Sequence, residues 1–236
     1  MANKTPLRTE NRLLAALPAA EYKRLRKKFE PVRLIRKRIL YECGQSIRSC
    51  YFFQNGMASV FAIGEDGRMV QIAIVDRNGF VGVPIVLMGS KSTVRIVTQT
   101  PVQAFKMDAK ELLVQLNREG KLREVLLRYT QALQAQVAQS ALCNPLHSIR
   151  QRLCRWLLMY RDSSQSDSFD LTQEEIASML GAHRNQIGME ARQLSKRGLI
   201  QFRRGTVSLL DQVGLEQESC ECYRAIRHWT DELSEI

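Results

Sequence analysis

The stretch LTQEEIASMLGAHRNQIGMEARQLSKRGLI, residues 171–200, decides the fold of the C-terminal part of this chain. Thr172 and Glu175 have the spacing of a capping box, which predicts that a helix begins there. Gly181 ends that helix, and a second helix starts within three residues. Two short helices joined by so tight a glycine turn predict a helix–turn–helix.

The second helix of this unit has two different sides. Ile187, Ala191 and Leu194 recur at helical spacing and predict the buried side. The opposite side and the first turn face outward, and in a helix–turn–helix they enter the major groove of DNA. Arg can form two hydrogen bonds to one guanine, Asn can pair with adenine, and Met can contact a thymine methyl. The residues expected to contact bases are Arg184, Asn185, Met189 and Arg192.

A basic hairpin follows the second helix. Residues 199–202 and 206–209 predict two strands around the turn Arg203-Arg204-Gly205, which form the wing of a winged helix–turn–helix. Residues 182–205 hold six Lys and Arg against one Glu. This charge alone would also suit a solvated amphipathic helix, but its combination with the cap, the turn and the wing favours DNA binding. We expect phosphate contacts from Thr172, Gln173, Lys196, Arg197, Arg203 and Arg204.

Upstream, residues 121–142 predict a long helix that contains no glycine or proline. Apolar residues form a stripe along it at three-to-four-residue spacing. Such a seam can meet a copy of itself in a short coiled coil, which predicts a homodimer. The alternative is that the seam packs on the β-structure of its own chain. The stripe consists of Leu122, Leu126, Tyr129, Leu133, Val137 and Ala141.

The N-terminal half predicts an antiparallel β-roll. Short runs rich in β-branched and aromatic residues occupy positions 51–53, 59–63, 69–75, 94–100 and 102–107. Asn55-Gly56, Asp66-Gly67 and Asn78-Gly79 separate them and supply the positive φ angles that tight hairpin turns need. One small all-β core is therefore expected in this part of the chain.

Helices are predicted on both sides of the roll. Asn11 caps a first short helix, and the spacing of Tyr22 to Val32 continues a helical pattern between basic residues. After the roll, residues 108–116 predict a short helix, and Asn144-Pro145 is expected to start another one before the polar loop 162–168. The chain is therefore predicted to be of the α+β class.

The composition indicates a folded protein with an anionic partner. Of 236 residues 44% are apolar, which excludes disordered and low-complexity classes, and 35 Lys and Arg against 24 Asp and Glu give a net charge of +11. Residues 1–50 carry +9 of this charge. We interpret the basic run 22–38 as a solvated face over the roll; the alternatives are contact with a membrane surface, an acidic protein or flanking DNA. No apolar span and no secretory signal are evident, so we expect a cytosolic protein without a membrane partner.

In their order along the chain these features resemble the CRP/FNR family of bacterial regulators, named for the cyclic-AMP receptor protein and the fumarate-nitrate regulator. The resemblance rests on the roll LYECGQSIRSCYFFQNGMASVFAIGEDGR, the long helix, and LTQEEIASMLGAHRNQIG with its RRG wing. The blocks ALCNPLHSIRQRLCRWLLMYRD and GLEQESCECY are similar to one large branch of the family.

Membership implies a division of the chain and a mode of action. It implies an N-terminal cyclic-nucleotide-binding-like β-roll in residues 1–117, a dimerisation helix in 118–142 and a winged helix–turn–helix domain in 143–236. Regulators of this family bind two-fold operators near promoters as homodimers. The resemblance therefore implies double-stranded DNA, a second copy of the chain and RNA polymerase as partners.

The sequence departs from the family's effector sites. Members that bind cyclic AMP carry a Gly-Glu pair for the ribose and an Arg-Ser pair for the phosphate, whereas this chain has Val81 and Ser92-Thr93 at those places. Without the arginine the phosphate lacks its bidentate partner, so the effector pocket around Val81, Ser92 and Thr93 is not expected to take cyclic AMP. Iron–sulfur members have cysteines clustered near the N-terminus, but the first cysteine here is Cys43, so no such cluster is expected. Asn185 and Met189 replace a Glu and an Arg of the cyclic-AMP receptor's pattern, so the operator should differ as well.

The C-terminal cysteines have two interpretations. Cys143, His147 and Cys154 would share one helical face, but Pro145 interrupts the geometry and no fourth ligand is evident. Cys220-Glu221-Cys222 is tighter than the usual C-x-x-C pattern and is interpreted as two small apolar positions of a helix. We therefore predict no metal site and no cofactor.

No catalytic motif is present, and the chain has only three histidines, so we predict that it is not an enzyme. The competing function is a signalling module whose helix–turn–helix binds another protein. Such a module would sense a ligand, or sense oxidants through pairing of Cys43 with Cys50.

Overall fold

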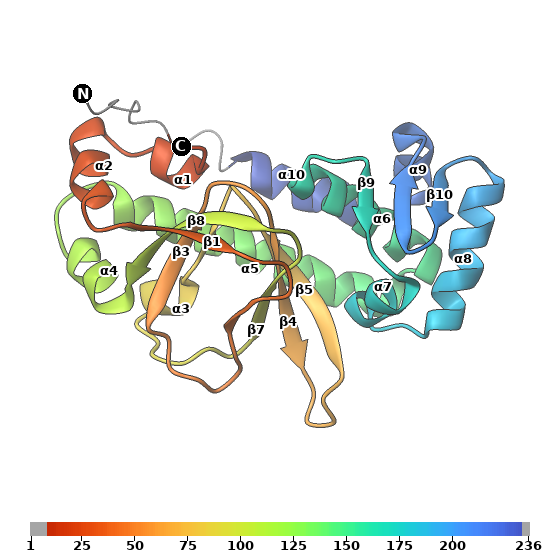
Figure 1. The fold of residues 1–236 in the computed structure, drawn as a ribbon, viewed down its shortest axis with the longest axis horizontal. Helices are drawn as coiled ribbons and strands as arrows, with labels where there is room; N and C mark the ends of the chain where they lie inside the picture. The colour runs from red at the N-terminus through yellow and green to blue at the C-terminus, as the bar shows by residue number, and fades with distance from the viewer. Residues whose placement is uncertain (1–8, 233–236) are drawn as a thin grey trace. The chain divides into compact units, whose positions relative to one another are not determined.

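The computed structural model describes residues 9–232, which form two compact units (Figure 1). The first unit contains residues 9–58 and 75–132 together with Glu232, and the second contains Ser59–Ile74 and Leu133–Asp231. Between residues 9 and 232, no helix has both the length and the apolar character that crossing a membrane requires.

Two short helices precede the roll, namely α1 (Arg12–Ala15) and α2 (Ala19–Arg26). Asn11 caps α1 as predicted, because its side-chain oxygen accepts the N–H of Leu14 at 3.1 Å. The Nδ2 group of the same side chain donates to the carbonyls of Phe53 at 2.9 Å and Gly79 at 2.8 Å. One buried asparagine thus fixes the helix start against two turns of the roll.

The roll contains two four-stranded sheets, which confirms the predicted β-rich N-terminal part. One sheet has the order β1-β8-β3-β6 and is antiparallel; in the other, β2 pairs antiparallel with β7, and β4 lies beside β5. Phe52 stacks on Phe80 with 5.1 Å between ring centroids and anchors the core of the first unit. The strands are β1 (Glu30–Leu34), β2 (Ile39–Tyr41), β3 (Ser49–Phe53), β4 (Ala58–Ile63), β5 (Met69–Val75), β6 (Phe80–Val81), β7 (Arg95–Thr98) and β8 (Val102–Asp108).

Two local predictions for this region are wrong. Val32, expected on a helix, lies in β1 opposite Ala104, because Pro31 lacks the N–H that a continuing helix needs. Gly79 does not have the positive φ that Gly56 has at +70°. A Cβ atom at Gly79 would lie 2.5 Å from the hydroxyl oxygen of Tyr129, so glycine allows a close approach here rather than a turn.

Helices α3 (Val83–Val86) and α4 (Ala109–Leu116) follow strands β6 and β8, and α5 (Leu122–Leu146) follows α4. The position of α4 matches the prediction, with Asp108 as its cap. The predicted helix start at Asn144-Pro145 is wrong, because α5 continues through Pro145 and the N–H of His147 donates to the carbonyl of Cys143 at 3.1 Å. The next helix starts only after Ser148, which forms a capping box with Gln151.

The apolar stripe of α5 divides into two parts. Leu122, Leu126 and Tyr129 are buried in the first unit, where the Tyr129 ring meets the edge of Phe80 at 5.7 Å between centroids. A second copy of the chain cannot reach these three side chains. Further along the helix Leu133 and Val137 are half-buried and Ala141 is exposed.

The second unit contains the predicted winged helix–turn–helix, which confirms the α+β class. The wing strands belong to a three-stranded antiparallel sheet of order β10-β11-β9, of which β9 was not predicted. Trp156, Tyr160 and Phe169 pack in its core with centroid distances of 5.1 and 4.6 Å. The elements are α6 (Ile149–Ser164), β9 (Ser168–Asp170), α7 (Gln173–Leu180), α8 (Arg184–Lys196), β10 (Ile200–Arg203), β11 (Thr206–Leu209), α9 (Gln212–Glu218) and α10 (Cys222–Glu232).

Candidate DNA-binding interface

The turn between α7 and α8 has the geometry that the sequence predicts. The hydroxyl oxygen of Thr172 accepts the N–H of Glu175 at 3.1 Å, and the Glu175 carboxylate accepts the N–H of Thr172 at 2.9 Å. Gly181 ends α7 in the left-handed conformation with φ +58°. The apolar side of α8, with Ile187 and Leu194 fully buried, then holds that helix at the edge of the second unit (Figure 1).

The opposite side of α8 is open. The four expected base contacts and Lys196 are all exposed, and Met189 retains 51% of its accessible surface although it is apolar. Within residues 9–232, Arg184, Arg192 and Lys196 form no ion pair with an acidic group. A row of fixed cations without protein anions attracts the phosphates of DNA, and an exposed Met beside them offers an apolar contact to a base.

The wing presents two further cations at a tight turn. Arg203 pairs with Thr206 across the hairpin, so Arg204 and Gly205 form a two-residue loop with φ angles of +47° and +84°. Positive φ at both positions defines the primed hairpin turn, whose twist suits the strands. Arg203 and Arg204 are both exposed at its tip. A Cβ atom at Gly205 would lie 3.9 Å from Cγ2 of Thr172, so the wing tip lies beside the start of α7.

Gly188 is a residue of the interface that the sequence analysis did not single out. It lies in the middle of α8, where glycine is unfavourable. A Cβ atom there would lie 2.9 Å from the side-chain oxygen of Gln173 and 3.6 Å from a guanidinium nitrogen of Arg192. Glycine therefore leaves room for the side chains of Gln173 and Arg192 beside this turn of α8. An unexplained glycine inside a predicted helix was the available signal.

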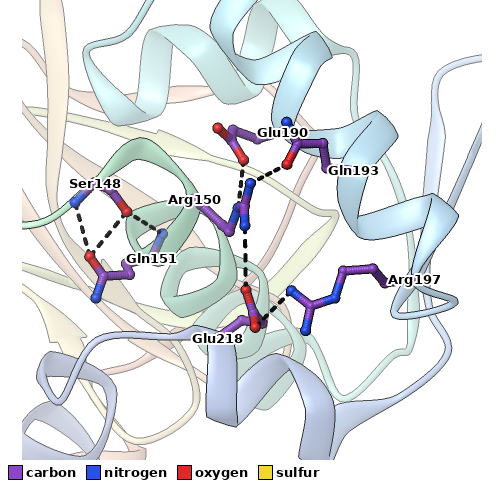
Figure 2. A network of polar contacts seen from close by, with 7 residues as sticks. All are labelled: Ser148, Arg150, Gln151, Glu190, Gln193, Arg197 and Glu218. Atoms are coloured by element: carbon purple, nitrogen blue, oxygen red, sulfur yellow. Dashed lines mark hydrogen bonds and ion pairs between the residues drawn. The ribbon is translucent and has the colours of Figure 1, made fainter.

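The other flank of α8 carries a network of charges that neutralise one another (Figure 2). Arg150 on α6 donates from Nε to Glu190 at 2.8 Å and from a second nitrogen to Gln193. Glu218 on α9 lies 3.9 Å from Arg150 and 2.8 Å from Arg197. Arg197, which the charge pattern groups with Lys196, thus faces a carboxylate of its own chain. The network joins α6, α8 and α9 and fixes the orientation of α8.

The three predicted effector residues lie in different environments. Val81 is buried in β6 opposite Tyr51, and Thr93 is exposed. Ser92 is buried, donates its hydroxyl to the carbonyl of Val94 at 2.7 Å, and lines a polar cavity of about 520 Å³ in the first unit. At the cavity wall, the hydrogen bond from Arg95 to Glu42 at 2.9 Å holds the pKa of Glu42 below its usual value.

The structure corrects the set of candidate metal ligands. Cys143 and His147 come together with Cys220 and Cys222, and their ligand atoms lie within 4.8 Å of one another. Cys154, which the sequence analysis grouped with the first two, is buried elsewhere because the helix that carries it starts anew after Ser148. Cys220 and Cys222 were not grouped with Cys143 and His147 because they lie more than 70 residues away along the chain.

A β-roll, a long helix and a winged helix–turn–helix with an open cationic face define a DNA-binding transcription regulator. A model of the cyclic nucleotide-binding domain matches residues 31–119, and a model of the Crp-like helix-turn-helix domain matches residues 151–218, so that together they cover more than half of the chain. The chain belongs to the CRP/FNR family of transcriptional regulators. It is accordingly a regulator of transcription and not an enzyme.

Relatives of known structure or name support this assignment. The chain is 26% identical over 195 residues to the transcriptional regulator LdrP of Thermus thermophilus, which covers 79% of this chain and 95% of LdrP. A putative CRP/FNR regulator from Eubacterium rectale superposes with a TM-score of 0.72 at 16% identity, covering 90% of this chain and 97% of that one. A CRP-family regulator from Thermus thermophilus superposes with a TM-score of 0.69 at 21% identity, covering 80% and 96%. At these identities the two structures establish the fold.

Proposed function

We propose that this protein acts as a homodimer that recognises a two-fold operator by inserting α8 of each protomer into the major groove. The open cationic face of α8, with its exposed Met189, is the observation that carries the proposal. Arg184, Asn185, Met189 and Arg192 contact base edges. Thr172, Gln173, Lys196, Arg203 and Arg204 contact phosphates and set the register.

The dimer in this proposal forms along α5. CRP/FNR family members bind DNA as dimers, and α5 has exposed apolar surface beyond the part that packs on the roll. Leu127 is 43% exposed and stands two heptads before Ala141, with Val137 on the adjoining side. We therefore assign the seam to Leu127, Leu133, Val137 and Ala141. In this division residues 118–142 form the dimerisation helix between a domain of residues 1–117 and one of residues 143–236.

We further propose that cyclic AMP is not the effector. Support comes from the two positions that differ from the family pattern: Val81 offers no carboxylate for a ribose, and the Ser92 hydroxyl already donates within its own loop. Neither position supplies an arginine for a cyclic phosphate. RNA polymerase is the expected further partner of a regulator that binds near promoters.

Selection of bound duplexes from a random pool tests the proposal, with the full-length protein and with or without cell extract. We expect two inverted half-sites whose centres stand one helical turn apart, about 34 Å, retained in a salt-sensitive manner. Added cyclic AMP should leave the affinity unchanged. Failure to enrich any sequence, together with DNA-independent capture of a protein through α8, would favour a protein-interaction module instead. Selection of single half-sites, together with a monomeric mass in analytical sedimentation, would contradict the proposed dimer.

A further inference from the structure

Four potential metal ligands converge inside the second unit. Cys143 and His147 come from the end of α5, and Cys220 and Cys222 come from the segment between α9 and the start of α10. The Sγ atoms of Cys143 and Cys220 are 3.5 Å apart, and Sγ of Cys222 is 3.5 Å from Nδ1 of His147. All three sulfur atoms belong to buried residues, and the histidine side chain is 13% exposed.

We propose that Cys143, His147, Cys220 and Cys222 bind one zinc ion through three thiolates and Nδ1 of the imidazole. Zinc–sulfur bonds of about 2.3 Å in a tetrahedron place neighbouring ligand atoms roughly 3.5–3.8 Å apart. The two separations of 3.5 Å, and the spread of the whole set within 4.8 Å, match one shared ion. A cluster of several irons would hold its ligands farther apart, on different iron atoms.

The surroundings of the four ligands resemble the outer shell of a metal site. Nε2 of His147 lies 3.2 Å from the carboxylate of Glu221, which leaves Nδ1 free to coordinate. Nε2 of Gln139 donates to Sγ of Cys222 at 3.1 Å, a contact that stabilises sulfur as a thiolate. These partners orient the ligands from outside the cluster, as carboxylates and amides do around structural zinc.

Charge balance gives an independent argument. Arg152 and Arg155 on α6 are buried, and in the described part of the chain the Nε–H group of each lacks a hydrogen-bond acceptor. Arg155 lines a small cavity together with Ser140 and Asn144, which stand on either side of Cys143 along α5. A zinc ion with three thiolates carries a net charge of −1 and offsets buried positive charge that neutral thiols leave uncompensated.

The site has a structural consequence for the DNA-binding unit. All four ligands are protein side chains, so no position stays open for a substrate, as in structural zinc sites. The ion would tie the start of α10 to the end of α5. This inference does not depend on the operator or the dimer proposed above.

Metal analysis of the full-length protein, made without a polyhistidine tag and kept reduced, tests the proposal. We expect about one zinc ion per chain, and after exchange the sulfur-to-cobalt charge-transfer bands of a tetrahedral thiolate site. The double variant Cys220→Ser, Cys222→Ser should hold less than about one tenth of that zinc. Cys154→Ala, which removes a buried cysteine of the same unit outside the cluster, should retain it.

The melting temperature with and without a chelator provides a test that does not depend on whether the double variant folds. The chelator should lower the melting temperature of the natural sequence and of Cys154→Ala, and zinc should restore it. The proposal is overturned if zinc-supplemented natural protein binds neither zinc nor cobalt, if the double variant keeps its zinc, or if iron with visible absorption occupies the site instead.

Discussion

The two flanks of α8 carry cations in opposite situations. On the outward flank Arg184, Arg192 and Lys196 are exposed and, in the part of the chain that the structure describes, stand without a carboxylate partner. On the inward flank the charges are paired: Glu190 meets Arg150 at 2.8 Å, and Arg197 meets Glu218 at the same distance (Figure 2).

This difference changes what the local charge means. The excess of Lys and Arg over residues 182–205 includes Arg197, whose charge Glu218 offsets. The cations that remain for DNA are those that lie on the outward flank and on the wing. The paired flank holds α8 against α6 and α9, so the outward side chains are presented from a fixed helix, which reduces the entropy lost on binding.

Arg184→Ala should have the largest effect, because a guanidinium in the first turn of α8 can bond two acceptors of one guanine. We expect a loss of about 1–3 kcal/mol at the selected operator, with relaxed preference at a single base pair of each half-site. Competition binding with the operator and all its single-base variants measures both. Arg224→Ala, which removes an exposed arginine from α10, serves as the charge-matched control. Equal losses on operator and random DNA would show that Arg184 does not read a base.

Arg203→Ala should have a smaller and more uniform effect. An arginine at the base of the wing turn contacts phosphate, so operator and random DNA should weaken alike and the slope of log K against log salt should fall in magnitude by about one. Arg203→Lys should keep the slope, since a phosphate accepts a point charge. A changed base preference in Arg203→Ala would place this side chain in a groove instead.

Local signals explain why the helix–turn–helix could be predicted. The capping box at Thr172, the glycine at 181 and the buried side of α8 all act over a few residues, and each has the predicted geometry. The run 69–75 likewise matches β5 residue for residue, because a short apolar run rich in β-branched residues favours a strand locally. Proline and glycine were less reliable signals. Helix α5 continues through Pro145, and Gly79 is required by the close approach of the Tyr129 ring rather than by a turn.

Features that depend on distant residues left no pattern in the sequence. Cys143 and Cys220 are separated by 77 positions, and they come together only because the segment that follows α9 lies beside the end of α5 in the folded chain. The same holds for Arg197, whose partner Glu218 comes from α9. Composition and periodicity show that such residues are present but not which of them are in contact. The Cys and His cluster and the ion pairs on the inward flank of α8 could therefore be found only in the structure.

Lys196 and Arg197 allow the sharpest test of the comparison, because they are neighbours with the same charge. Lys196→Ala should lower the magnitude of the salt slope by about one, since its ammonium faces outward and neutralises a phosphate. Arg197→Ala should leave the slope unchanged. It should instead lower the stability of the second unit slightly, by about 0.5 kcal/mol, the usual contribution of a partly exposed ion pair.

Salt-dependent binding and thermal melting of the two variants, made in parallel, separate these effects. Glu218 retains Arg150 at 3.9 Å after Arg197→Ala, which is why the expected loss of stability is small. If Arg197→Ala lowered the salt slope as much as Lys196→Ala does, the ion pair with Glu218 would have to open on binding. The arginines of the inward flank would then contact DNA rather than support α8, and the proposed difference between the two flanks would be wrong.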